Sequence, residues 1–493
     1  MKANSLKLVL SMFGLLSLSS ACGGSGESKG NGGEKSSDIK ISINNSSTGD
    51  LIPADFSGLS VETGSVRKGN AHYDGQWLFS GKNAQTLQIF KNLGLKHLRV
   101  GGGSVDINQP EPTREDIDEL FSFAKESGVK IVYSFKLLNG DIEHNVELAK
   151  YIWGRYKQYI DCFSVGNEPD WNSYHKDDPE ITDYPTYRNK WKKIASAIQV
   201  AIPEAKFMGP NTGSNYPVTR AKDTNHDGVS WTVHFAMDLK TSGLLCKLAQ
   251  HNYVGQDVAE QQLTPEQMIG KMLSASWNDV EYPALYNATL KPVLDEGFPY
   301  RLAESNSFSS GCDGGSNCFA TALFSLDYMH WWAGHGCAGV NFHNKQWVLN
   351  GPITVDEVTH ELLVNPVGYG IAAFNLSGQG TVLPIHVDKG NELNVTAYAV
   401  KNGKDVFVTL INKEYGTDAK AATVSVDLDV AVRKVKTLEL ISSEGKPDSR
   451  KVTLGGAVIE SSGDWNGKWK SHKDELVFHV KATSALIVKI STK

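Results

Sequence analysis

Short apolar runs alternate with longer amphipathic stretches over residues 56–380. The longer stretches repeat their apolar positions with helical spacing, for example over 116–127, 146–158 and 187–201. Strands that alternate with helices predict a parallel sheet, because each parallel connection needs a crossover. Eight such units match a closed (β/α)8 barrel of the TIM-barrel type. The strand candidates are 56–62, 97–103, 130–137, 162–169, 206–212, 248–254, 300–307 and 339–344.

Beyond residue 380 the apolar positions repeat with a period of two. Regular alternation with turn signals between the runs predicts an antiparallel β-sandwich over 381–493. Three isoleucines alternate in the same way ahead of the barrel, so residues 39–55 are expected to lend a strand to this sandwich. The predicted fold class is therefore α/β, a barrel over 56–380 with a C-terminal β-sandwich.

Residues 1–22 have the features of a secretory signal. Two lysines precede an apolar run over 8–18, which is shorter than the roughly 20 residues that a membrane-spanning helix needs. The small residues that lead into Cys22 resemble a bacterial lipoprotein signal, in which that cysteine is acylated and becomes the first residue. Ser19 departs from this pattern, since Leu is usual there. An ordinary secretory signal with a chance cysteine is the alternative.

Residues 23–38 are polar and rich in Gly and Ser, so they are predicted to form a flexible tether. A lipid on Cys22 would then hold the folded part at a membrane, outside the cytoplasm in the cell envelope. Oxidation is permitted in that compartment. Cys312 and Cys318 are therefore expected to form a disulfide across a Gly-rich loop, with free thiols as the alternative.

Composition and motifs exclude several classes of partner. The formal charge of −6 offers no basic face for nucleic acid. No histidine pair has metal-binding spacing and no Gly-rich phosphate loop is present, so neither a cofactor nor a resident metal is expected. The segment DTNHDG (223–228) resembles half of a calcium loop, but the twelfth position is His234 instead of Glu. A plain turn is the alternative for this segment.

Two glutamates stand at the ends of predicted barrel strands, where active sites of this architecture lie. Glu168 ends the fourth strand within VGNEPDW, and Glu304 ends the seventh within AESNS. Such a pair can face one sugar from both sides of a glycosidic bond; retaining glycosidases hold it about 5–5.5 Å apart as proton donor and nucleophile. Asn167 can hydrogen-bond the 2-hydroxyl of that sugar. Solvated surface acids are the alternative, disfavoured because both glutamates end apolar strands.

An ordered set of motifs adds a resemblance to a known family. The chain resembles glycoside hydrolase family 79, the β-glucuronidase and heparanase family, which carries its acid/base on strand four and its nucleophile on strand seven. The strand-rich tail is similar to the C-terminal β domain of that family. The motifs are FSGLSVE (56–62), LRVGGGSVD (98–106), GNEPD (166–170), AESNS (303–307), FATALFSLDYM (319–329), AGHGCAGVNFHN (333–344) and YGIAAFNLSGQG (369–380).

The resemblance implies a retaining β-glycosidase that acts on glucuronide-containing glycans or glycosides, with Glu168 as acid/base and Glu304 as nucleophile. It places Glu62 and Asp106 near the glycone hydroxyls and Tyr253 beside the nucleophile. No cofactor is implied, and the expected partner is a carbohydrate. The residues assigned to substrate binding within these motifs and strands are Glu62, Asp106, Asn167, Tyr253 and Asn306.

The chain departs from that family where glucuronidases hold the C6 carboxylate. Ser309 and Gly368 stand where two tyrosines are expected. The backbone N–H of Gly311 or Gly314 could bind a carboxylate as a nest, and Lys345 could supply charge. Without such partners a neutral sugar would fit better, since a buried carboxylate needs donors. The alternatives are thus a retaining β-glycosidase for a neutral sugar and a catalytically inactive glycan-binding lipoprotein.

Overall fold

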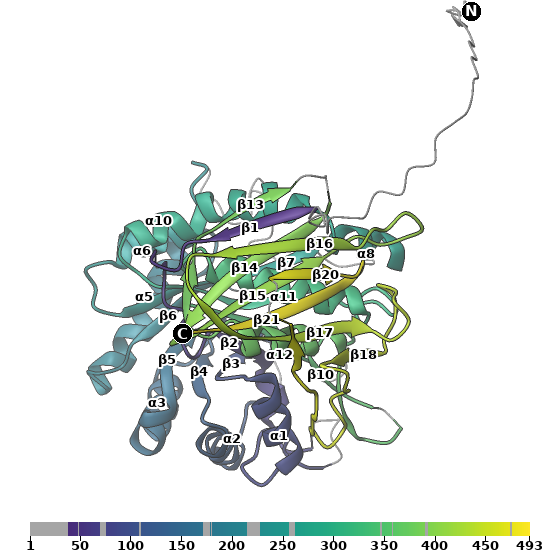
Figure 1. Cartoon of the computed structure of the whole chain (residues 1–493). Coiled ribbons are helices and arrows are strands. Elements are labelled where there is room, and N and C mark those ends of the chain that lie inside the picture. Colours follow the sequence, from purple (N-terminus) through teal and green to yellow (C-terminus); the bar gives the residue numbers. More distant parts are fainter. Residues whose placement is uncertain are drawn as a thin grey trace, which may run out of the picture. The chain divides into compact units, whose positions relative to one another are not determined.

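The computed structural model describes residues 38–493 except 48, 70–74, 108–109, 171–177, 179, 214–226, 256–261, 346–347, 357, 390–392 and 474–475 (Figure 1). The predicted signal, its Cys22 and residues 23–37 of the tether lie outside the described residues, as does most of the calcium-loop candidate. Its last part is described: Asp227 pairs with His234 at 2.9 Å. None of the described helices is both long and apolar enough to span a membrane.

Eight parallel strands close into a barrel in sequence order, from β2 to β9. The predicted (β/α)8 architecture is therefore confirmed, and each strand candidate overlaps one observed strand. The barrel strands are β2 (Ser57–Glu62), β3 (His97–Gly101), β4 (Lys130–Phe135), β5 (Ile160–Val165), β6 (Phe207–Thr212), β7 (Leu245–Gly255), β8 (Tyr300–Phe308) and β9 (Gly339–His343). Small and apolar side chains from β4 to β8 form a separate cluster inside the barrel, made of Val132, Cys162, Met208, Ala249 and Ala303.

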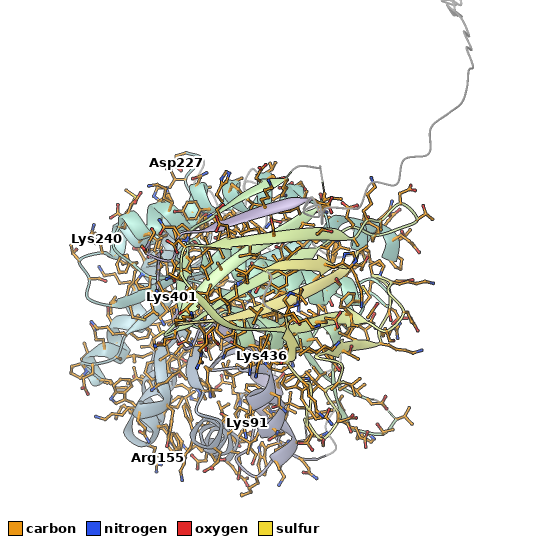
Figure 2. The ribbon with its side chains drawn as sticks, in the orientation of Figure 1. Lys91, Arg155, Asp227, Lys240, Lys401 and Lys436 are labelled. Atoms are coloured by element: carbon orange, nitrogen blue, oxygen red, sulfur yellow. The ribbon has the colours of Figure 1, made fainter. Side chains whose placement is uncertain are left out.

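Helices fill the crossovers and cover the barrel. Their outer faces carry exposed charges, such as Lys91 on α1, Arg155 on α3 and Lys240 at the end of α6 (Figure 2). Two π-helical turns, Trp277–Glu281 and Tyr286–Leu290, flank α9. The α-helices are α1 (Ala84–Leu93), α2 (Arg114–Ser127), α3 (Ile142–Tyr156), α5 (Tyr184–Ala201), α6 (Trp231–Leu239), α8 (Pro265–Met272), α9 (Tyr282–Leu285), α10 (Lys291–Asp295), α11 (Phe319–Ala333) and α12 (Pro366–Ser377).

Local sequence signals set the ends of these helices, as α2 illustrates. It begins at a capping box, in which Thr113 Oγ1 accepts from the Asp116 N–H and Asp116 Oδ2 accepts from the Thr113 N–H. It ends at Gly128, whose φ of 72° is in the left-handed region that favours glycine. The face turned to the barrel is apolar at helical spacing, with Ile117, Leu120, Phe121 and Ala124 buried.

The C-terminal residues form two sheets that continue past the barrel. One has the order β13-β1-β16-β20, and the other has the order β12-β14-β15-β21-β17-β18 with β19 beside β17. A short hairpin, β10 (Ile353–Val355) with β11 (Leu362–Val364), follows the last barrel strand. The sheet strands are β12 (Thr381–Leu383), β13 (Ile385–Lys389), β14 (Val395–Asn402), β15 (Asp405–Asn412), β16 (Ala422–Leu428), β17 (Val432–Ser442), β18 (Val452–Leu454), β19 (Lys470–His472), β20 (Val477–Val480) and β21 (Ser484–Thr492).

Strand β1 (Ile39–Ile43) precedes the barrel in sequence but lies between β13 and β16 (Figure 1). It pairs antiparallel with β13 and parallel with β16, so the sandwich is not antiparallel throughout. Its three isoleucines are buried and the residues between them are exposed. Asp38, predicted as the last residue of the tether, extends this pairing instead, because its N–H donates to the Thr423 carbonyl at 2.9 Å.

A buried carboxylate on α11 connects the barrel to the sandwich. Asp327 Oδ2 pairs with Lys413 Nζ at 2.9 Å, and their side chains are 5% and 1% exposed. Asp327 Oδ1 accepts from the hydroxyls of Thr396 at 2.6 Å and Tyr398 at 2.7 Å. Burial raises the pKa of Asp327, but Lys413 and the two hydroxyls outweigh burial and lower it. The carboxylate is therefore an anion whose partners all come from the sandwich strands or the residue after them.

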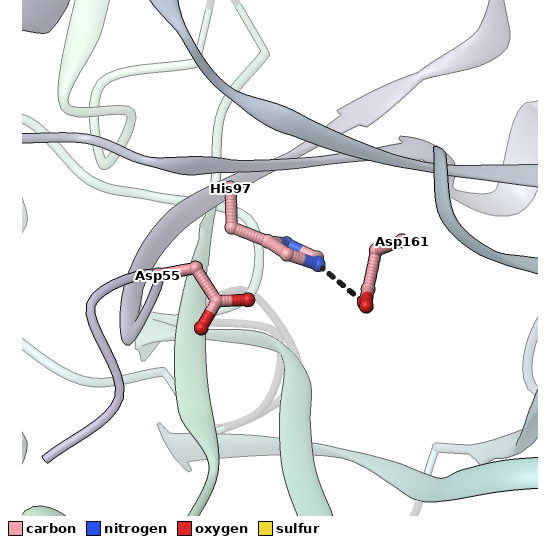
Figure 3. A group of neighbouring side chains, drawn as sticks. All are labelled: Asp55, His97 and Asp161. Carbon is pink, nitrogen blue, oxygen red and sulfur yellow. Dashed lines mark hydrogen bonds and ion pairs between the residues drawn. The ribbon is translucent and has the colours of Figure 1, made fainter. Parts of the chain in front are cut away.

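A polar network around His97 lies at the end of the barrel where the parallel strands begin. Arg301 Nε donates to Asn341 Oδ1 at 2.6 Å, which turns the Asn341 amide N–H toward His97 Nδ1 at 2.9 Å. His97 Nδ1 must therefore accept, and Nε2–H donates to Asp161 at 3.2 Å (Figure 3). Burial and the charge of Arg301 lower the pKa of His97 to about 4. The ring is held neutral by its neighbours.

Asp55, His97 and Asp161 have ligand atoms within 4.8 Å of one another, which is a spacing that a metal ion could use (Figure 3). Both acids already face cations, however. Lys247 pairs with Asp161 at 2.6 Å, and Arg301 lies 3.7 Å from Asp55. These side chains supply the positive charge that a metal would bring, so we interpret the group as a structural network.

Acidification is expected to destabilise the fold through His97. An unfolded imidazole binds a proton near pH 6.5, whereas folded His97 resists protonation down to about pH 4. The stabilisation is therefore complete above pH 6.5 and is lost as the pH falls toward 4, by roughly 3 kcal/mol. Urea unfolding of His97→Gln and the wild type between pH 7 and 4.5 measures this slope, with His386→Gln, an exposed position, as control. An unchanged slope in His97→Gln would contradict the assignment.

Candidate active site

The two predicted acids meet at the end of the barrel where the parallel strands terminate. Glu168 follows β5, and Glu304 lies within β8. One carboxylate oxygen of each and a ring nitrogen of His251, on β7, all lie within 4.8 Å of one another. Such a close approach is compatible with the pair of a retaining glycosidase, whose carboxyl groups lie about 5–5.5 Å apart.

Glu304 is held by three donors. Arg99 Nη1 donates to Oε2 at 2.8 Å, the Ser60 hydroxyl to Oε2 at 3.1 Å, and the Tyr253 hydroxyl to Oε1 at 2.8 Å. Burial raises the pKa of Glu304, but two neighbouring histidines, Arg99 and the Tyr253 hydrogen bond together hold it well below its usual range. Glu304 is therefore an anion at neutral pH, buried and oriented.

Arg99 connects the two sides of the site. Its Nη1 binds Glu304, and its Nη2 donates to Asn167 Oδ1 at 2.7 Å, next to Glu168 in the chain. Its side chain is fully buried. The sequence-based prediction did not include Arg99 or Ser60. A signal for Arg99 was present, because an arginine inside the apolar run HLRVGGG must find a paired partner when that run is buried.

Glu168 lies on a strained turn. Its φ of 45° is in the left-handed region, which is uncommon for a residue with a side chain and is concentrated at functional sites. Gly166, with φ of 75°, permits the turn, since a Cβ there would be 2.7 Å from Leu137 Cδ2. The Glu168 N–H donates to the Asn211 carbonyl at 2.8 Å, and its Oε1 lies 2.9 Å from His251 Nδ1. The turn thus aims the carboxylate at β7.

Asp106 supports this turn from behind. Its Oδ1 accepts from the N–H groups of Leu137 and Leu138 at 2.8 and 3.0 Å, and its Oδ2 accepts from the Asn167 N–H at 2.9 Å. The prediction placed Asp106 near a sugar hydroxyl, but both oxygens bind backbone of the surrounding loops. We interpret Asp106 as a residue that positions Asn167 and Glu168.

Glu62, at the end of β2, is a third carboxylate near the site. Its Oε1 pairs with Lys345 Nζ at 2.9 Å and lies 3.4 Å from His343 Nε2, and its Oε2 accepts from the Ser104 N–H at 2.7 Å. Burial raises the pKa of Glu62, but His343 and Lys345 outweigh burial and hold it at about 2. The predicted substrate residues Glu62 and Lys345 are therefore brought together as an ion pair.

Asn306 and Gly311, both predicted to bind substrate, have contacts within the chain. The Asn306 amide donates to the carbonyls of His343 at 3.1 Å and Asn350 at 2.8 Å, so both of its N–H groups bind backbone. Gly311, with φ of 72°, packs beside Val348 and the Asn350 N–H. These contacts join the end of β8 and the loop after it to the end of β9 and the segment after it.

The remaining carboxylate-binding candidates also have other surroundings. The Gly314 N–H donates to Asn317 Oδ1 at 2.8 Å, and the Ser309 N–H donates to the Gly255 carbonyl at 3.3 Å. Gly368 lies inside α12, where a Cβ would be 2.8 Å from Val364 Cγ1. A tyrosine would not fit at Gly368 without rearranging the helix.

The predicted disulfide between Cys312 and Cys318 is wrong, because both are free thiols in the structure. Ser316 folds the loop into a tight turn, accepting from the Cys312 N–H at 3.0 Å and donating its own N–H to the Cys312 carbonyl at 2.8 Å. Cys318 points into the interior, donates to the Gly315 carbonyl, and has its pKa raised to about 11 by burial. Closeness in sequence does not make two Cβ vectors converge.

Comparisons with known proteins find similar structures but no similar sequences. No family model matches the chain, and no curated protein matches it in sequence. Solved structures do match over nearly the whole chain. A 4-O-α-L-rhamnosyl-β-D-glucuronidase from Fusarium oxysporum has 15% identity and a TM-score of 0.68, covering 91% of this chain and 99% of its own.

Two other similar structures come from different glycosidase families. A family 51 arabinofuranosidase from Xanthomonas axonopodis pv. citri has 13% identity and a TM-score of 0.67, covering 92% of this chain and 100% of its own. A family 44 endoglucanase from Clostridium acetobutylium has 12% identity and a TM-score of 0.62, covering 92% and 99%. The chain thus has the barrel-and-sandwich fold that these structures share.

Proposed function

We propose that this chain is a retaining β-glycosidase in which Glu304 is the nucleophile and Glu168 the acid/base. The observation that carries the proposal is the approach of the two carboxylates to within 4.8 Å at the strand ends of a barrel. The activities of the similar structures, a glucuronidase, an arabinofuranosidase and an endoglucanase, support a glycosidic substrate.

The reaction proceeds by double displacement. Glu304 attacks the anomeric carbon, the bond from that carbon to the leaving oxygen breaks, and protonated Glu168 gives its proton to that oxygen. Glu168, now a carboxylate, takes a proton from a water that attacks the anomeric carbon, and the bond to Glu304 breaks. Two inversions give net retention, and Glu168 ends protonated as it began.

The surrounding residues prepare this pair. Arg99, Ser60 and Tyr253 keep Glu304 ionised and fix both of its oxygens. Arg99 donates to the side-chain oxygen of Asn167 and so fixes the orientation of its amide. In that orientation the amide N–H groups can bind a glycone hydroxyl beside Glu168. Fixed donors and acceptors of this kind lower the barrier because they need no reorganisation during the reaction.

Two glycones are candidates within this activity. β-Glucuronic acid is supported by the resemblance to family 79 and by Lys345, a cation beside the proposed catalytic pair. A neutral sugar is supported by Ser309 and Gly368, which stand where tyrosines would hold the carboxylate, and by Gly314, whose N–H already binds Asn317 Oδ1. Hydrolysis rates of matched aryl β-glucuronide and β-glucoside substrates separate the two.

A fluorinated glycosyl inactivator tests the activity itself, because it traps the covalent intermediate of a retaining enzyme. Peptide mapping by mass spectrometry is expected to find the sugar on Glu304. Label on any other residue would contradict the assignment. The second candidate class, an inactive glycan-binding lipoprotein, would bind the sugar without any label or turnover.

We also propose that the chain is anchored in the bacterial cell envelope through a lipid on Cys22. The support is the signal-like sequence before that cysteine and the Gly/Ser-rich segment after it. Detergent phase partitioning of the full-length protein from cells tests this placement; recovery only in the aqueous phase would count against the anchor.

Replacing Tyr253 with Phe is expected to move the acidic limb of the pH profile of kcat/KM to higher pH. The Tyr253 hydrogen bond lowers the pKa of Glu304, so its removal raises that pKa, and Glu304 must be ionised to attack. A drop of about tenfold in kcat/KM near neutral pH should accompany the shift. Tyr415→Phe, at an exposed position, is the control. An unmoved limb would show that Tyr253 does not tune the nucleophile.

A further inference from the structure

The Glu62 carboxylate is held by close contacts from several segments of the chain. The Ser104 N–H binds one of its oxygens and Lys345 the other. Gly102, with φ of 67°, lies flat against the carboxylate, since a Cβ there would be 2.6 Å from Glu62 Cδ. The carboxylate is buried and ionised at neutral pH. Its position is therefore fixed, and Lys345 is its long, flexible partner.

Lys345 is the exposed end of this pair. Its side chain is 32% exposed, and Glu62 uses one of its three N–H groups. Burial lowers the pKa of Lys345, but the charges of Glu62, Glu304 and Glu168 raise it, so the ammonium lies close enough to both proposed catalytic carboxylates to interact with their charge. Arg99, the other cation there, is fully buried and bound at both terminal nitrogens. A ligand would therefore meet Lys345.

The charges around this space cancel in pairs. Lys345 is matched by Glu62, and Arg99 is matched by Glu304. A sugar carboxylate bound to Lys345 would lie within about 6 Å of Glu62, which would repel it and already pairs with the same ammonium. A hydroxyl in the same place can accept from Lys345 and donate to a carboxylate without that repulsion.

His343 provides a second indication that hydroxyls are expected here. It is 5% exposed; its Nδ1 has no hydrogen-bond partner among the described residues, and its Nε2 lies 3.4 Å from Glu62 Oε1. Buried polar atoms in folded proteins nearly always have partners, so an unpaired ring nitrogen beside a binding site is suited to a ligand. An imidazole can accept from one hydroxyl and donate to another.

We propose that the Glu62–Lys345 ion pair, with His343 beside it, is a charge filter in the glycone subsite that selects uncharged β-glycosides. The proposal rests on the proposed glycosidase function and specifies its substrate class. Lys345 holds a glycone hydroxyl, and Glu62 keeps Lys345 in place while cancelling the charge that would attract a uronic acid. The filter is local to the end of β2 and the segment after β9.

The test compares kcat/KM for nitrophenyl β-glucoside, β-xyloside and β-glucuronide. Glucoside and glucuronide differ only at C6, and the xyloside lacks C6. The wild type is expected to hydrolyse one of the neutral substrates at least about tenfold faster than the glucuronide. Glu62→Gln keeps an acceptor for the Ser104 N–H but frees Lys345, so it should raise the glucuronide-to-glucoside ratio about ten- to a hundredfold.

Lys345→Gln should change the glucuronide-to-glucoside ratio of kcat/KM in the opposite direction. It leaves Glu62 charged without its cation, so the same ratio should fall at least about tenfold. Glu439→Gln, which loses an ion-paired glutamate on the sandwich, is the matched control and should leave the ratio unchanged. If Glu62→Gln fails to fold, Lys345→Gln still tests the direction of the change in the ratio. Lys345 is the more exposed member of the pair, so its replacement is less disruptive to folding.

The outcomes separate the filter from the activity on which it rests. Turnover with a label on Glu304, but a wild-type preference for the glucuronide, overturns the filter and leaves the glycosidase standing. A ratio that does not rise in Glu62→Gln, or does not fall in Lys345→Gln, also overturns it. A chain that hydrolyses none of the substrates and takes no label overturns the glycosidase and the filter together.

Discussion

Glu304→Ala is expected to lower kcat/KM by about 10⁴- to 10⁶-fold, with little change in the binding of unreacted substrate. The variant loses the atom that forms the covalent intermediate. It also opens space on the face of the sugar opposite the leaving group. Azide should therefore enter that space, restore part of the rate with an activated substrate, and give a glycosyl azide of α configuration.

The interpretation of Glu304→Ala depends on a folded protein. Removing the carboxylate leaves Arg99 buried beside a missing partner, and breaking a buried pair of this kind costs about 3–5 kcal/mol. Glu304→Gln keeps one acceptor oxygen for Arg99, and its amide N–H can donate to the Tyr253 hydroxyl. It should be equally inactive, although it leaves no room for azide. Glu361→Ala, at an exposed position, is the control. A Glu304→Gln variant with more than a few per cent of wild-type activity would remove Glu304 from its proposed role.

Glu168→Ala is expected to show a loss that depends on the leaving group. For substrates with sugar or alkyl leaving groups, kcat/KM should fall by about 10²- to 10⁴-fold, because those oxygens need a proton as the bond breaks. A dinitrophenyl glycoside needs no such proton, so its first step should be nearly unaffected and the intermediate should accumulate. The second step then lacks its base.

Azide again distinguishes the residue. In Glu168→Ala it enters where the acid/base stood, attacks the intermediate from that side, and should give a β-configured azide. The two variants thus produce opposite anomers from one substrate, measured by proton NMR of the product. Equal losses for good and poor leaving groups, or an α product from Glu168→Ala, would rule out the acid/base role.

The barrel could be predicted from the sequence because each of its strands is an apolar run that ends at a polar turn. Glu168 is an example: Gly166 and Pro169 stop the run, and the strand ends are where a parallel barrel gathers its polar side chains. The lone strand β1 could be assigned for a similar reason, since three alternating isoleucines need one buried face.

Side-chain partners could not be predicted in the same way. Asp106 binds backbone N–H groups after β4 and β5, and which amides point at it depends on loop geometry that no periodicity encodes. Cys312 and Cys318 are six residues apart, yet the turn between them directs one thiol inward. The neutral state of His97 depends on Arg301 through Asn341, residues brought together only by barrel closure.

The buried carboxylate of Asp327 limits how this chain can be truncated or combined with other proteins. A chain cut after Ser377 would keep α11 but lose Lys413, Thr396 and Tyr398, which together compensate that anion. An uncompensated buried charge costs about 3–5 kcal/mol, a large share of the 5–15 kcal/mol by which a typical native fold is stable. The barrel is therefore not a portable module, and chimeras or truncations must carry the C-terminal strands with it.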